Sequence, residues 1–307
     1  MISIKKFQET ILSWYAKNRR DLPWRNTKDP YKILVSEIML QQTQVPRVLP
    51  KYKEFLKAFP TFETLSKAPD KKLLKVWQGL GYWRRAKYLK ETAKIIVKEE
   101  KTADLTRRVG AHVESEAKRG VKREEKPQLE RNFPKIPEQL EKLPGIGHYT
   151  ARAIACFAFD RCEAFLDTNI RRVYLHFFFQ GKENVSDKEI FPLAKKAIFS
   201  LPKEISPREW HYALFDYGAT VLKGKAINKR SRHHAKQSKF EGSFRSFRTK
   251  ALRFVLSSPK SKITHEEIEE YIRELIRQKD STYSPASIID SLLKDDLLKK
   301  SPTHYFL

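Results

Sequence analysis

The sequence predicts an all-α protein that ends in a small separate module. Apolar residues recur at helical spacing from Phe7 to Leu222, and the alternating runs that indicate strands are nearly absent before residue 296. Two glycines, Gly145 and Gly147, separate two helical segments and permit a tight hairpin. At 307 residues, the chain is long enough for two or three domains.

Helices are expected wherever apolar residues recur with a period of 3.6 residues. In the first of them, Phe7, Ile11 and Tyr15 share one face. Asp29-Pro30 marks the start of the second, because proline is tolerated in the first turn of a helix. The expected helices before the hairpin are 2–18, 31–42, 52–59, 72–77 and 84–98, and those after it are 150–159, 170–179, 190–201 and 210–222.

Two connecting segments differ from ordinary loops. Gly79–Trp83 is a glycine-hinged loop rich in aromatic residues, which are either core aromatics or a wedge for a stack of bases. In residues 101–132 about half of the side chains are charged, with both signs mixed. We expect this second segment to be a solvated insertion or a frayed helix with little core.

The segment Leu143–Gly147 lies between a short helix over residues 137–142 and the apolar helix over 150–159. A hairpin of this kind presents backbone N–H groups at the positive end of the second helix, where an anion such as a phosphate binds. The segment is therefore interpreted as a helix-hairpin-helix. The alternative is an ordinary tight turn in an all-α protein.

Two acidic residues are candidates for chemistry. Glu37 shares a partly apolar stripe with Ile33 and Leu40, so it lies either at the solvent edge of that stripe or in a desolvated position. Desolvation would raise its pKa and suit it to general acid catalysis. Asp167 stands at the N-cap position of the helix over 170–179, and capping is the alternative to a catalytic role.

The composition points to a polyanionic partner. The formal net charge is +25 and the sequence pI is about 9.9, which favours nucleic acid. Neither a membrane-spanning run nor a signal peptide is evident, so we expect a cytoplasmic protein with no membrane partner. The two cysteines, Cys156 and Cys162, are too few for a disulfide framework and are expected to be packing or surface residues in a reducing compartment.

The amino-acid composition changes in the C-terminal part of the chain. Residues 223–239 carry many basic side chains and no acidic one, which is typical of a phosphate-contacting or flexible segment. Helices are then expected over 244–256, 265–276 and 285–293, followed by two short stretches that could pair as a ribbon. This order predicts a winged helix. The likeliest apolar anchors of this module on the rest of the protein are Phe240, Phe244 and Phe247.

Several motifs together resemble the helix-hairpin-helix DNA glycosylases, and among them the MutY-type adenine DNA glycosylases, over about residues 7–222. The hairpin indicates the superfamily, and the Glu-x-x-Leu-Gln-Gln-Thr-Gln segment indicates the adenine branch. The implied fold is the two-lobed helix-hairpin-helix glycosylase fold. The motifs are Leu22-Pro23-Trp24-Arg25, Pro30-Tyr31-Lys32, Glu37-Ile38-Met39-Leu40-Gln41-Gln42-Thr43-Gln44, Gly79-Leu80-Gly81-Tyr82, Leu143-Pro144-Gly145-Ile146-Gly147-His148-Tyr149-Thr150-Ala151 and Leu166-Asp167-Thr168-Asn169.

The resemblance implies a role for each matched residue. Glu37 would protonate N7 of adenine and later handle the water, and Asp167 would stabilise the sugar cation, a division of labour like that of the glycosidases. Tyr149 and Asn169 would form a polar shell around the sugar. Because a tyrosine cannot form an imine, the enzyme would be monofunctional. The residues implied in contacts with DNA or with the flipped base are Trp24, Arg25, Leu40, Gln41, Gln42, Thr43, Leu80, Tyr82, Gly145, Gly147, His148 and Tyr212.

The chain also departs from that family. At the four positions where relatives commonly carry the cysteine ligands of a [4Fe–4S] cluster, it has Leu222, Lys229, Arg232 and Ser238, so we expect no cluster and no other cofactor. The position that usually offers Gln or Glu to adenine holds Tyr212. The segment from about Phe244 is too short for the Nudix-like domain that reads oxidised guanine, and the charged insertion precedes the hairpin.

The expected organisation follows from these motifs. A monovalent cation is expected on hairpin carbonyls near Leu143 and Ile146, and the protein is expected to act as a monomer on double-stranded DNA. The expected parts are a terminal-helix lobe (1–28 and 148–240, with a cluster-less loop at 222–239), a six-helix lobe (29–147, with the insertion 101–132) and a C-terminal module (243–307).

Three functions remain open at this point. The first is excision of adenine mispaired with guanine or 8-oxoguanine, in base excision repair. The second is a thymine glycosylase for G·T mismatches; Gln41 and Gln42 favour adenine, because those relatives tend to carry arginines there. The third is an inactive DNA-binding homologue, against which the acidic pair Glu37 and Asp167 argues.

Overall fold

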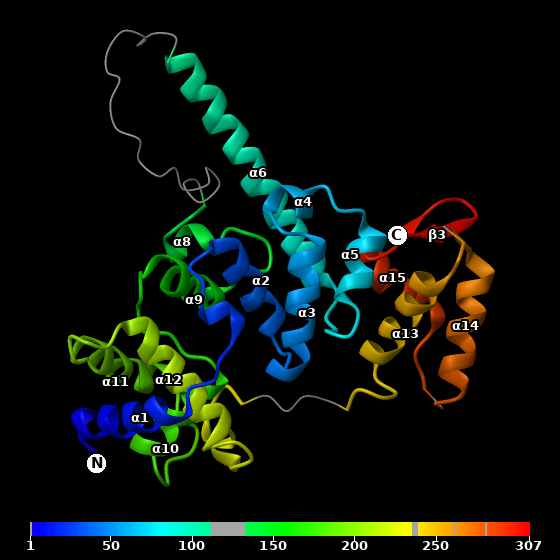
Figure 1. Cartoon of the computed structure of the whole chain (residues 1–307). Helices are drawn as coiled ribbons and strands as arrows, with labels where there is room; N and C mark the ends of the chain where they lie inside the picture. The colour runs from blue at the N-terminus through cyan, green and yellow to red at the C-terminus, as the bar shows by residue number, and fades with distance from the viewer. Residues whose placement is uncertain (1, 112–132, 235–238, 261, 280) are drawn as a thin grey trace. The chain divides into compact units, whose positions relative to one another are not determined.

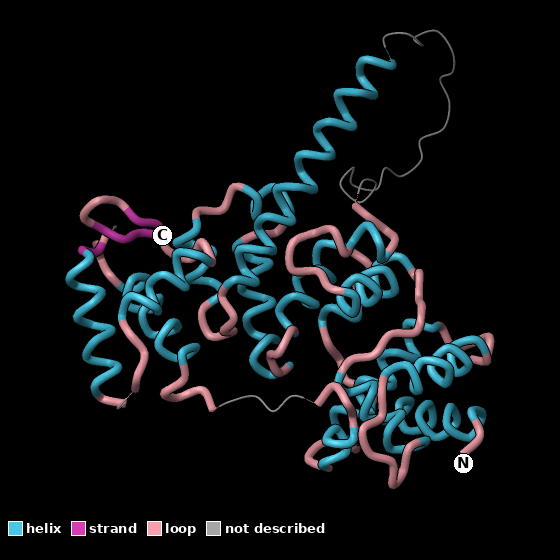
Figure 2. The backbone as a smooth tube through the Cα atoms, turned by 180° about the vertical axis from the view of Figure 1, so that it is seen from behind, coloured by secondary structure: helices cyan, strands magenta, loops and turns pink. Residues whose placement is uncertain are grey.

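Helices carry nearly all the regular structure of the protein (Figure 1). The structure is a computed structural model that describes residues 2–111, 133–234, 239–260, 262–279 and 281–307. Within these ranges, strands occur only near the C-terminal end, as Figure 2 shows. The all-α prediction is confirmed.

The helices before the hairpin agree with the sequence pattern except at three places. The helix expected over 52–59 is α3, which begins at Val45; the other two differences concern α4 and α6. α4 was not expected, because five residues are too few to show a period; Thr61 caps it, its Oγ1 accepting from Thr64 N at 3.3 Å. α6 continues past the expected end into the charged segment, of which residues 112–132 lie outside the described residues. These elements are α1 (Ile4–Asn18), η1 (Pro23–Arg25), α2 (Pro30–Leu40), α3 (Val45–Ala58), α4 (Phe62–Ser66), α5 (Asp70–Trp77) and α6 (Arg84–Ala111).

The elements after residue 133 begin with the helix-hairpin-helix. Several of their helices have serine or aspartate caps, as at Ser206, whose Oγ accepts from Glu209 N at 3.1 Å. They are α8 (Pro137–Leu140), α9 (His148–Phe159), α10 (Thr168–Phe178), α11 (Asp187–Phe199), α12 (Pro207–Thr220) and the 3₁₀ turn η2 (Ala226–Arg230).

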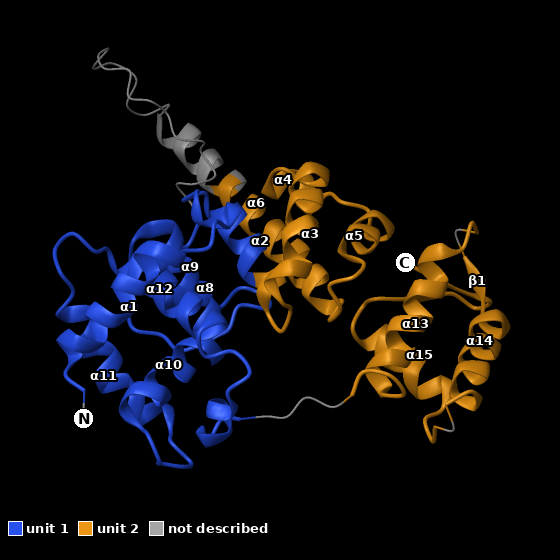
Figure 3. Cartoon of the chain, turned by 60° about the horizontal axis from the view of Figure 1, so that its bottom comes forward, with its two compact units in different colours: residues 1–37, 133–236 blue, residues 38–132, 237–307 orange. Residues whose placement is uncertain are grey.

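The chain divides into two compact units (Figure 3). Unit 1 comprises residues 1–37 and 133–236, and unit 2 comprises residues 38–132 and 237–307, so the boundary falls inside α2 directly after Glu37. The hairpin helix α8 belongs to unit 1, where it packs on α9.

Each unit has its own aromatic core. In unit 1, the Phe7 ring on α1 lies 5.3 Å from that of Tyr174 on α10 and 5.5 Å from that of Trp210 on α12, measured between ring centroids. In unit 2, the Phe55 ring lies 5.9 Å from that of Trp77, which joins α3 to α5. These rings are almost fully buried, so the three helices of unit 1 are fixed relative to one another.

The C-terminal module has the element order of a winged helix. The strand β3 pairs antiparallel with β1 (Ile263 opposite Tyr305) and with β2 (Lys300 opposite Tyr305). β1 was not expected, because a strand of two residues leaves no alternating pattern. The elements are α13 (Phe244–Ser257), β1 (Ile263–Thr264), α14 (His265–Arg277), α15 (Pro285–Lys294), β2 (Lys299–Lys300) and β3 (His304–Phe306).

The expected aromatic anchors of this module are not its anchors. Phe244 and Phe247 pack on Tyr283 inside the module, at centroid distances of 5.1 and 5.9 Å, and Phe240 is 41% exposed. Ion pairs join the module to the rest of unit 2 instead. The pairs are Lys87–Asp296 (2.6 Å), Arg84–Asp295 (3.2 Å) and Lys299–Asp70 (3.6 Å).

The interpretation of the cysteines is also corrected. Cys156 and Cys162 form a disulfide, with Cα atoms 4.1 Å apart. Asp160 ends α9 in the left-handed conformation (φ 55°) and turns the chain back, so that Cys162 returns to the last turns of the helix. A sequence separation of six residues does not reveal this return.

Among the described residues, no helix is long and apolar enough to cross a membrane.

Candidate active site

Glu37 is a buried carboxyl in unit 1. Its residue is only 5% exposed, because the second half of α2 is apolar on nearly every face and is buried as a whole. Burial raises the pKa of Glu37 to about 8, and the negative charge of Asp167 adds to the rise, whereas a hydrogen bond from Tyr149 and the charge of Arg25 oppose it. The carboxyl is therefore protonated at neutral pH, as a general acid must be.

Tyr149 holds Glu37 from the start of α9. Its hydroxyl donates to Glu37 Oε2 at 3.4 Å, and its ring packs edge-on against that of Phe165 at 5.6 Å. Burial, together with the charges of Glu37 and Asp167, raises the pKa of Tyr149 well above its ordinary value. Tyr149 therefore stays a hydroxyl donor and orients the carboxyl.

Asp167 caps α10. Its Oδ1 accepts from Ile170 N at 2.6 Å and its Oδ2 from Asn169 Nδ2 at 2.9 Å. Burial raises the pKa of Asp167, while these hydrogen bonds and the charge of Arg171 oppose the rise. The carboxylate is thus fixed in orientation by the helix start and lies near enough to Glu37 and Tyr149 to affect their pKa values.

Helix α12 supports the start of α10 at Gly218. A Cβ atom at this position would lie 2.4 Å from the carbonyl oxygen of Asn169, so the two backbones touch. Arg172 Nη1 donates to the carbonyl of Gly218 at 2.7 Å and to Asn169 Oδ1 at 3.4 Å. The close approach requires glycine and positions Asn169 and its neighbour Asp167.

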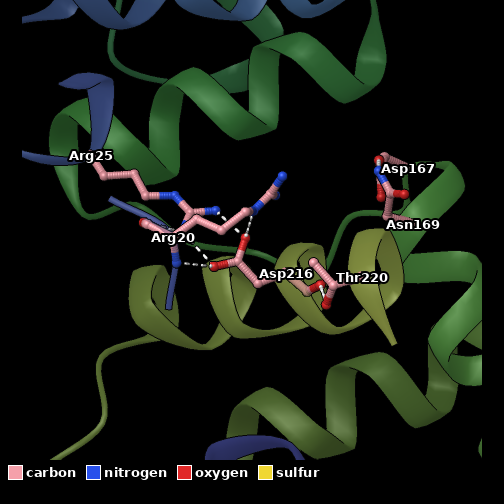
Figure 4. A network of polar contacts seen from close by, with 6 residues as sticks. All are labelled: Arg20, Arg25, Asp167, Asn169, Asp216 and Thr220. Carbon is pink, nitrogen blue, oxygen red and sulfur yellow. Dashed lines mark hydrogen bonds and ion pairs between the residues drawn. The ribbon is translucent and has the colours of Figure 1, made fainter. Parts of the chain in front are cut away.

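A buried ion-pair network lies beside them (Figure 4). Asp216 is fully buried on α12, and Arg25 reaches it with two hydrogen bonds of 2.7 and 2.8 Å, while Arg20 Nε donates at 2.6 Å. Burial acts to raise the pKa of Asp216, but the two arginines outweigh it and lower the pKa. The fork-shaped pairing fixes the Arg25 guanidinium.

Tyr212 packs against the Arg25 side chain of this network. The Arg25 guanidinium lies 4.5 Å from the centroid of its ring, and the Phe157 ring stacks on it at 4.6 Å. The charge of Glu37 is among the causes that raise the pKa of Tyr212, after burial. Trp24 is 5% exposed in the short turn η1. Of the residues expected as walls of a base pocket, Arg25 and Tyr212 interact electrostatically with Glu37, Arg25 is paired to Asp216, and Trp24 is buried in the same unit.

The hairpin leads directly into α9. Gly145 has φ 76°, a conformation that favours glycine, and Gly147 is the N-cap of α9 with nothing within 4 Å of a Cβ at its position. The Leu143 carbonyl accepts from Ile146 N at 3.2 Å and closes the turn. His148 is exposed and lies 3.1 Å from Glu141. A cation on these carbonyls stays a prediction.

The other candidates lie in unit 2, where Arg85 holds them. Its buried guanidinium donates to the carbonyls of Ile38, Met39 and Gln41 at 2.6–2.9 Å, and to those of Leu80 and Gly81 at 3.1 Å. It thereby ties the end of α2 to the aromatic loop. Leu40 ends α2; the remaining candidates in this region are Gln42 (φ 55°), Thr43, which donates to Leu80 O at 3.2 Å, and Tyr82 (φ 45°).

The residues at the cluster positions do not fit an iron–sulfur group. Leu222 is a buried apolar side chain, Lys229 and Arg232 are exposed cations, and Ser238 lies outside the described residues. Arg230 attaches the loop that follows Leu222 to the end of α10: its guanidinium donates to the carbonyls of Phe179 at 2.8 Å and Leu175 at 3.1 Å. These are carbonyls at the end of α10, so Arg230 acts as its C-terminal cap.

A second group of side chains has the spacing of possible metal ligands. The sulfur atoms of Cys156 and Cys162 and a ring nitrogen of His211 lie within 4.8 Å of one another, in the described part of the chain. The sulfurs are bonded to each other, and His211 Nδ1 lies 2.7 Å from the Pro207 carbonyl. Burial lowers the pKa of His211 to about 4, so the ring is neutral. This group does not offer thiolate ligands in the structure.

The fold and the hairpin define a class of DNA repair protein. Residues 35–198, more than half of the chain, match the family described as HhH-GPD superfamily base excision DNA repair protein. The chain belongs to this superfamily. Among solved structures it is similar to a thermostable thymine-DNA glycosylase, with a TM-score of 0.57 and 28% identity, over 73% of this chain and 89% of the other. An endonuclease III trapped on DNA (TM-score 0.51, 16% identity, 74% and 91% coverage) shares the fold.

Its curated relatives narrow the class further. The adenine DNA glycosylase of Buchnera aphidicola subsp. Baizongia pistaciae is 37% identical over 70% of this chain and 52% of the relative. That of Mycobacterium tuberculosis (strain CDC 1551 / Oshkosh) is 34% identical over 69% and 60%, and that of Homo sapiens 30% over 71% and 36%. The chain spans from about a third to three fifths of the length of these relatives.

Sequence reasoning missed four residues that support the site. Asp216 interrupts an apolar helix one turn after Tyr212, which is the only signal it leaves. Arg85 follows the glycine loop at the start of a helix, and Gly218 lies inside a helix where glycine is disfavoured. Arg230 lies among other basic residues and leaves no signal of its own.

Proposed function

We propose that this protein is a monofunctional adenine DNA glycosylase that removes adenine mispaired with guanine or 8-oxoguanine. The observation that carries the proposal is the buried carboxyl of Glu37, with a pKa of about 8, held by Tyr149 near the N-cap carboxylate Asp167. The names of the relatives, adenine DNA glycosylases, support the choice of adenine.

In this proposal the two carboxyls divide the reaction. Glu37 donates its proton to N7 of the flipped adenine, and the C1′–N9 bond breaks with its electron pair leaving on the base. Asp167 stabilises the positive charge that develops on the sugar, while Tyr149 and Asn169 orient the two carboxyls. Water then adds to C1′ and gives a proton to the Glu37 carboxylate, so the products are free adenine and an abasic site.

The proposed enzyme cuts no DNA strand. Strand cleavage through a Schiff base needs an amine beside the sugar, and the residue that holds Glu37 is a tyrosine. The proposal includes no cofactor. Elemental analysis of purified protein is expected to find no iron, and a brown, iron-containing preparation would contradict this.

The proposed partner is double-stranded DNA with a mismatched or damaged base pair. The start of α9 at Gly147 would hold a phosphate at the positive end of the helix, and the net charge of +25 would provide general affinity. We propose that the protein acts as a monomer on chromosomal DNA in the cytoplasm.

A thymine glycosylase for G·T mismatches is the second candidate, because one similar solved structure is a thymine-DNA glycosylase. Gln41 and Gln42 favour adenine, as do the curated relatives. A catalytically inactive homologue is the third, and it gives no reason to bury a carboxyl at Glu37 beside a second one, since an unpaired buried acid destabilises a fold.

One assay separates these functions. Enzyme in excess is incubated with duplexes that carry one adenine or thymine opposite guanine, 8-oxoguanine or cytosine, and free base and strand cleavage are measured with and without hot alkali. We expect release of adenine, strand cleavage only after alkali, and little trapping by borohydride. Release of thymine alone would establish the second candidate, and no release of either base would establish the third.

A further inference from the structure

The disulfide of unit 1 lies beside a buried histidine. Cys156 Sγ is 3.9 Å from His211 Nδ1, and the sulfur of Cys162 belongs to the same group, whose ligand atoms all lie within 4.8 Å of one another. Cys156 is in the last turns of α9 and Cys162 follows that helix, whereas His211 is on α12. Three side chains able to bind a metal thus meet from segments far apart in the sequence.

The spacing of these atoms is close to that of a tetrahedral zinc site. With zinc–sulfur bonds of about 2.3 Å and zinc–nitrogen bonds of about 2.0–2.1 Å, neighbouring ligand atoms lie roughly 3.5–3.8 Å apart. Cys156 Sγ and His211 Nδ1 are near this separation already. The Cα atoms of the two cysteines are 4.1 Å apart, so both sulfurs can reach one ion once they are no longer bonded to each other.

The surroundings of the group are compatible with a bound ion. The Phe165 ring stacks face to face on His211 at 4.0 Å, which fixes the imidazole and leaves its edge, where both nitrogens lie, clear of the stack. Cys156 and His211 are buried and Cys162 is half-buried, so an ion would enter from the side of Cys162. A divalent ion held by two thiolates and a neutral imidazole has no net charge, which limits the cost of burying it.

We propose that Cys156, Cys162 and His211 bind a zinc ion after a thiol reductant has opened the disulfide. A water molecule on the side of Cys162 would complete the four ligands that zinc takes. The proposal goes beyond the proposed function and does not depend on it. The site uses none of residues 222–238, and its ion takes no part in base excision.

The proposed reaction has two steps. A dithiol reductant gives two electrons and two protons to the sulfurs and is itself oxidised to a disulfide. Zinc then replaces the two thiol protons, which are released to the solvent. His211 Nδ1 now lies 2.7 Å from the Pro207 carbonyl; on binding zinc, its proton moves to Nε2 and the ring stays neutral. The carbonyl keeps the backbone donor that the helix supplies four residues later.

The disulfide and the zinc ion would hold the same two segments together. The chain after Cys162 leads to Phe165, whose ring packs on that of Tyr149 at 5.6 Å, and then to Asp167. The proposed site would therefore keep this segment attached to α9 in reducing as well as oxidising surroundings.

The test uses Co²⁺ as a spectroscopic substitute for zinc. Full-length protein is reduced with a dithiol, freed of the reductant without air and titrated with Co²⁺ alone. Thiolate-to-cobalt charge transfer reports only ions bound by cysteine, so histidines on the surface do not contribute. We expect this absorbance to saturate at one Co²⁺ per chain and to be displaced by Zn²⁺ with release of protons. Oxidised protein should not show it.

Two variants locate the ion. Cys162→Ser removes the half-buried sulfur and should weaken Co²⁺ binding at least about 100-fold, since even changes around the ligands of a metal can cost 10–100-fold. His233→Gln is the matched control: it removes an exposed imidazole of the same unit, 3.9 Å from Asp187. It should bind Co²⁺ as the wild type does.

Reduced wild-type protein without thiolate–cobalt absorbance would overturn the proposal, and so would a Cys162→Ser variant of unchanged Co²⁺ affinity. If reduction abolishes the helical circular dichroism, Zn²⁺ should restore it, and a failure to do so would equally overturn the site. None of these measurements involves DNA, so a failure of the proposed function is detected separately, by the excision assay.

Discussion

At the scale of the residue, the ionisation of Glu37 couples chemistry to stability. The folded protein holds this carboxyl with a pKa of about 8, against an ordinary value of 4.5. Between these two values the folded state keeps a proton that the unfolded state has lost. Its contribution to stability is therefore complete below pH 4.5 and is lost as the pH rises to about 8.

This coupling predicts how Glu37→Gln changes stability. Glutamine keeps the shape and cannot ionise, so the variant should match the wild type near pH 4.5 and exceed it by about 5 kcal/mol in free energy of unfolding at pH 9, since each unit of pKa difference corresponds to about 1.4 kcal/mol. Thermal or urea unfolding as a function of pH measures the difference. Glu138→Gln, an exposed site in α8, is the control and should follow the wild type. If the free energies of unfolding of Glu37→Gln and wild type differed by the same amount at all pH values, the raised pKa of Glu37 would be contradicted.

The two roles of Asp167 can be separated in the same way. Asparagine caps helices as well as aspartate does, so Asp167→Asn should keep stability within about 0.5 kcal/mol while excision falls by about 10²–10⁴-fold. Asp167→Ala loses the cap as well and should cost a further ~1 kcal/mol. Single-turnover excision and urea unfolding of both variants make the comparison. Near-normal excision by Asp167→Asn would leave this residue with a capping role only.

At the scale of the element, the contact between α10 and α12 positions the site. In Gly218→Ala the new Cβ atom would overlap the Asn169 carbonyl at 2.4 Å, so the start of α10 must shift. We expect a loss of stability of about 1–3 kcal/mol and a fall in excision of about 10–100-fold, because Asp167 and Asn169 move with the backbone. Unfolding and single-turnover excision test it. An alanine variant of full activity would show that this contact does not position the carboxylate.

The end of α10 depends on the clamp by Arg230. Arg230→Met keeps the length of the side chain and removes both donors to the Leu175 and Phe179 carbonyls. We expect a loss of about 1–3 kcal/mol in free energy of unfolding, which denaturant titration measures. Lys229→Met changes the exposed neighbour in the same turn and should have little effect. Equal effects of the two substitutions would refute the clamp.

The same elements show what a sequence can predict. Long helices such as α1 and α10 are predicted by the helical spacing of their apolar residues and by their capping residues, and the hairpin is predicted by its two glycines. By contrast, α4 and β1 are too short to leave a period. Arg85 and the disulfide depend on chain segments that meet only after folding, as Arg85 meets the carbonyls at the end of α2.

Some residues of the candidate site could likewise be predicted from the sequence, and others could not. Motifs selected Glu37, Tyr149, Asp167 and Asn169, and the structure brings these four together in unit 1. They did not select Asp216, because its function is to hold Arg25, and pairing across 191 residues has no local pattern. Supporting residues are therefore identified from contacts in the structure, and candidate reacting residues from their chemistry.

At the scale of the whole molecule, a strongly basic chain carries a buried carboxyl, Glu37, at its candidate site. In the proposed function, the excess of 25 positive charges would attract DNA without selecting a base or a bond. In the proposed reaction Glu37 supplies the proton, which must be present when the glycosidic bond breaks. The central claim is thus that adenine excision requires the protonated form of one carboxyl whose pKa is about 8.

The pH dependence of single-turnover adenine excision, at saturating enzyme and constant salt, tests this claim most directly. The rate constant should be level near neutrality and should fall tenfold for each pH unit above about 8, as the Glu37 proton is lost. Glu37→Gln should show only a small residual rate without this fall. A wild-type rate that stays constant from pH 7 to pH 10, or a Glu37→Gln variant with a near-normal rate, would contradict the account.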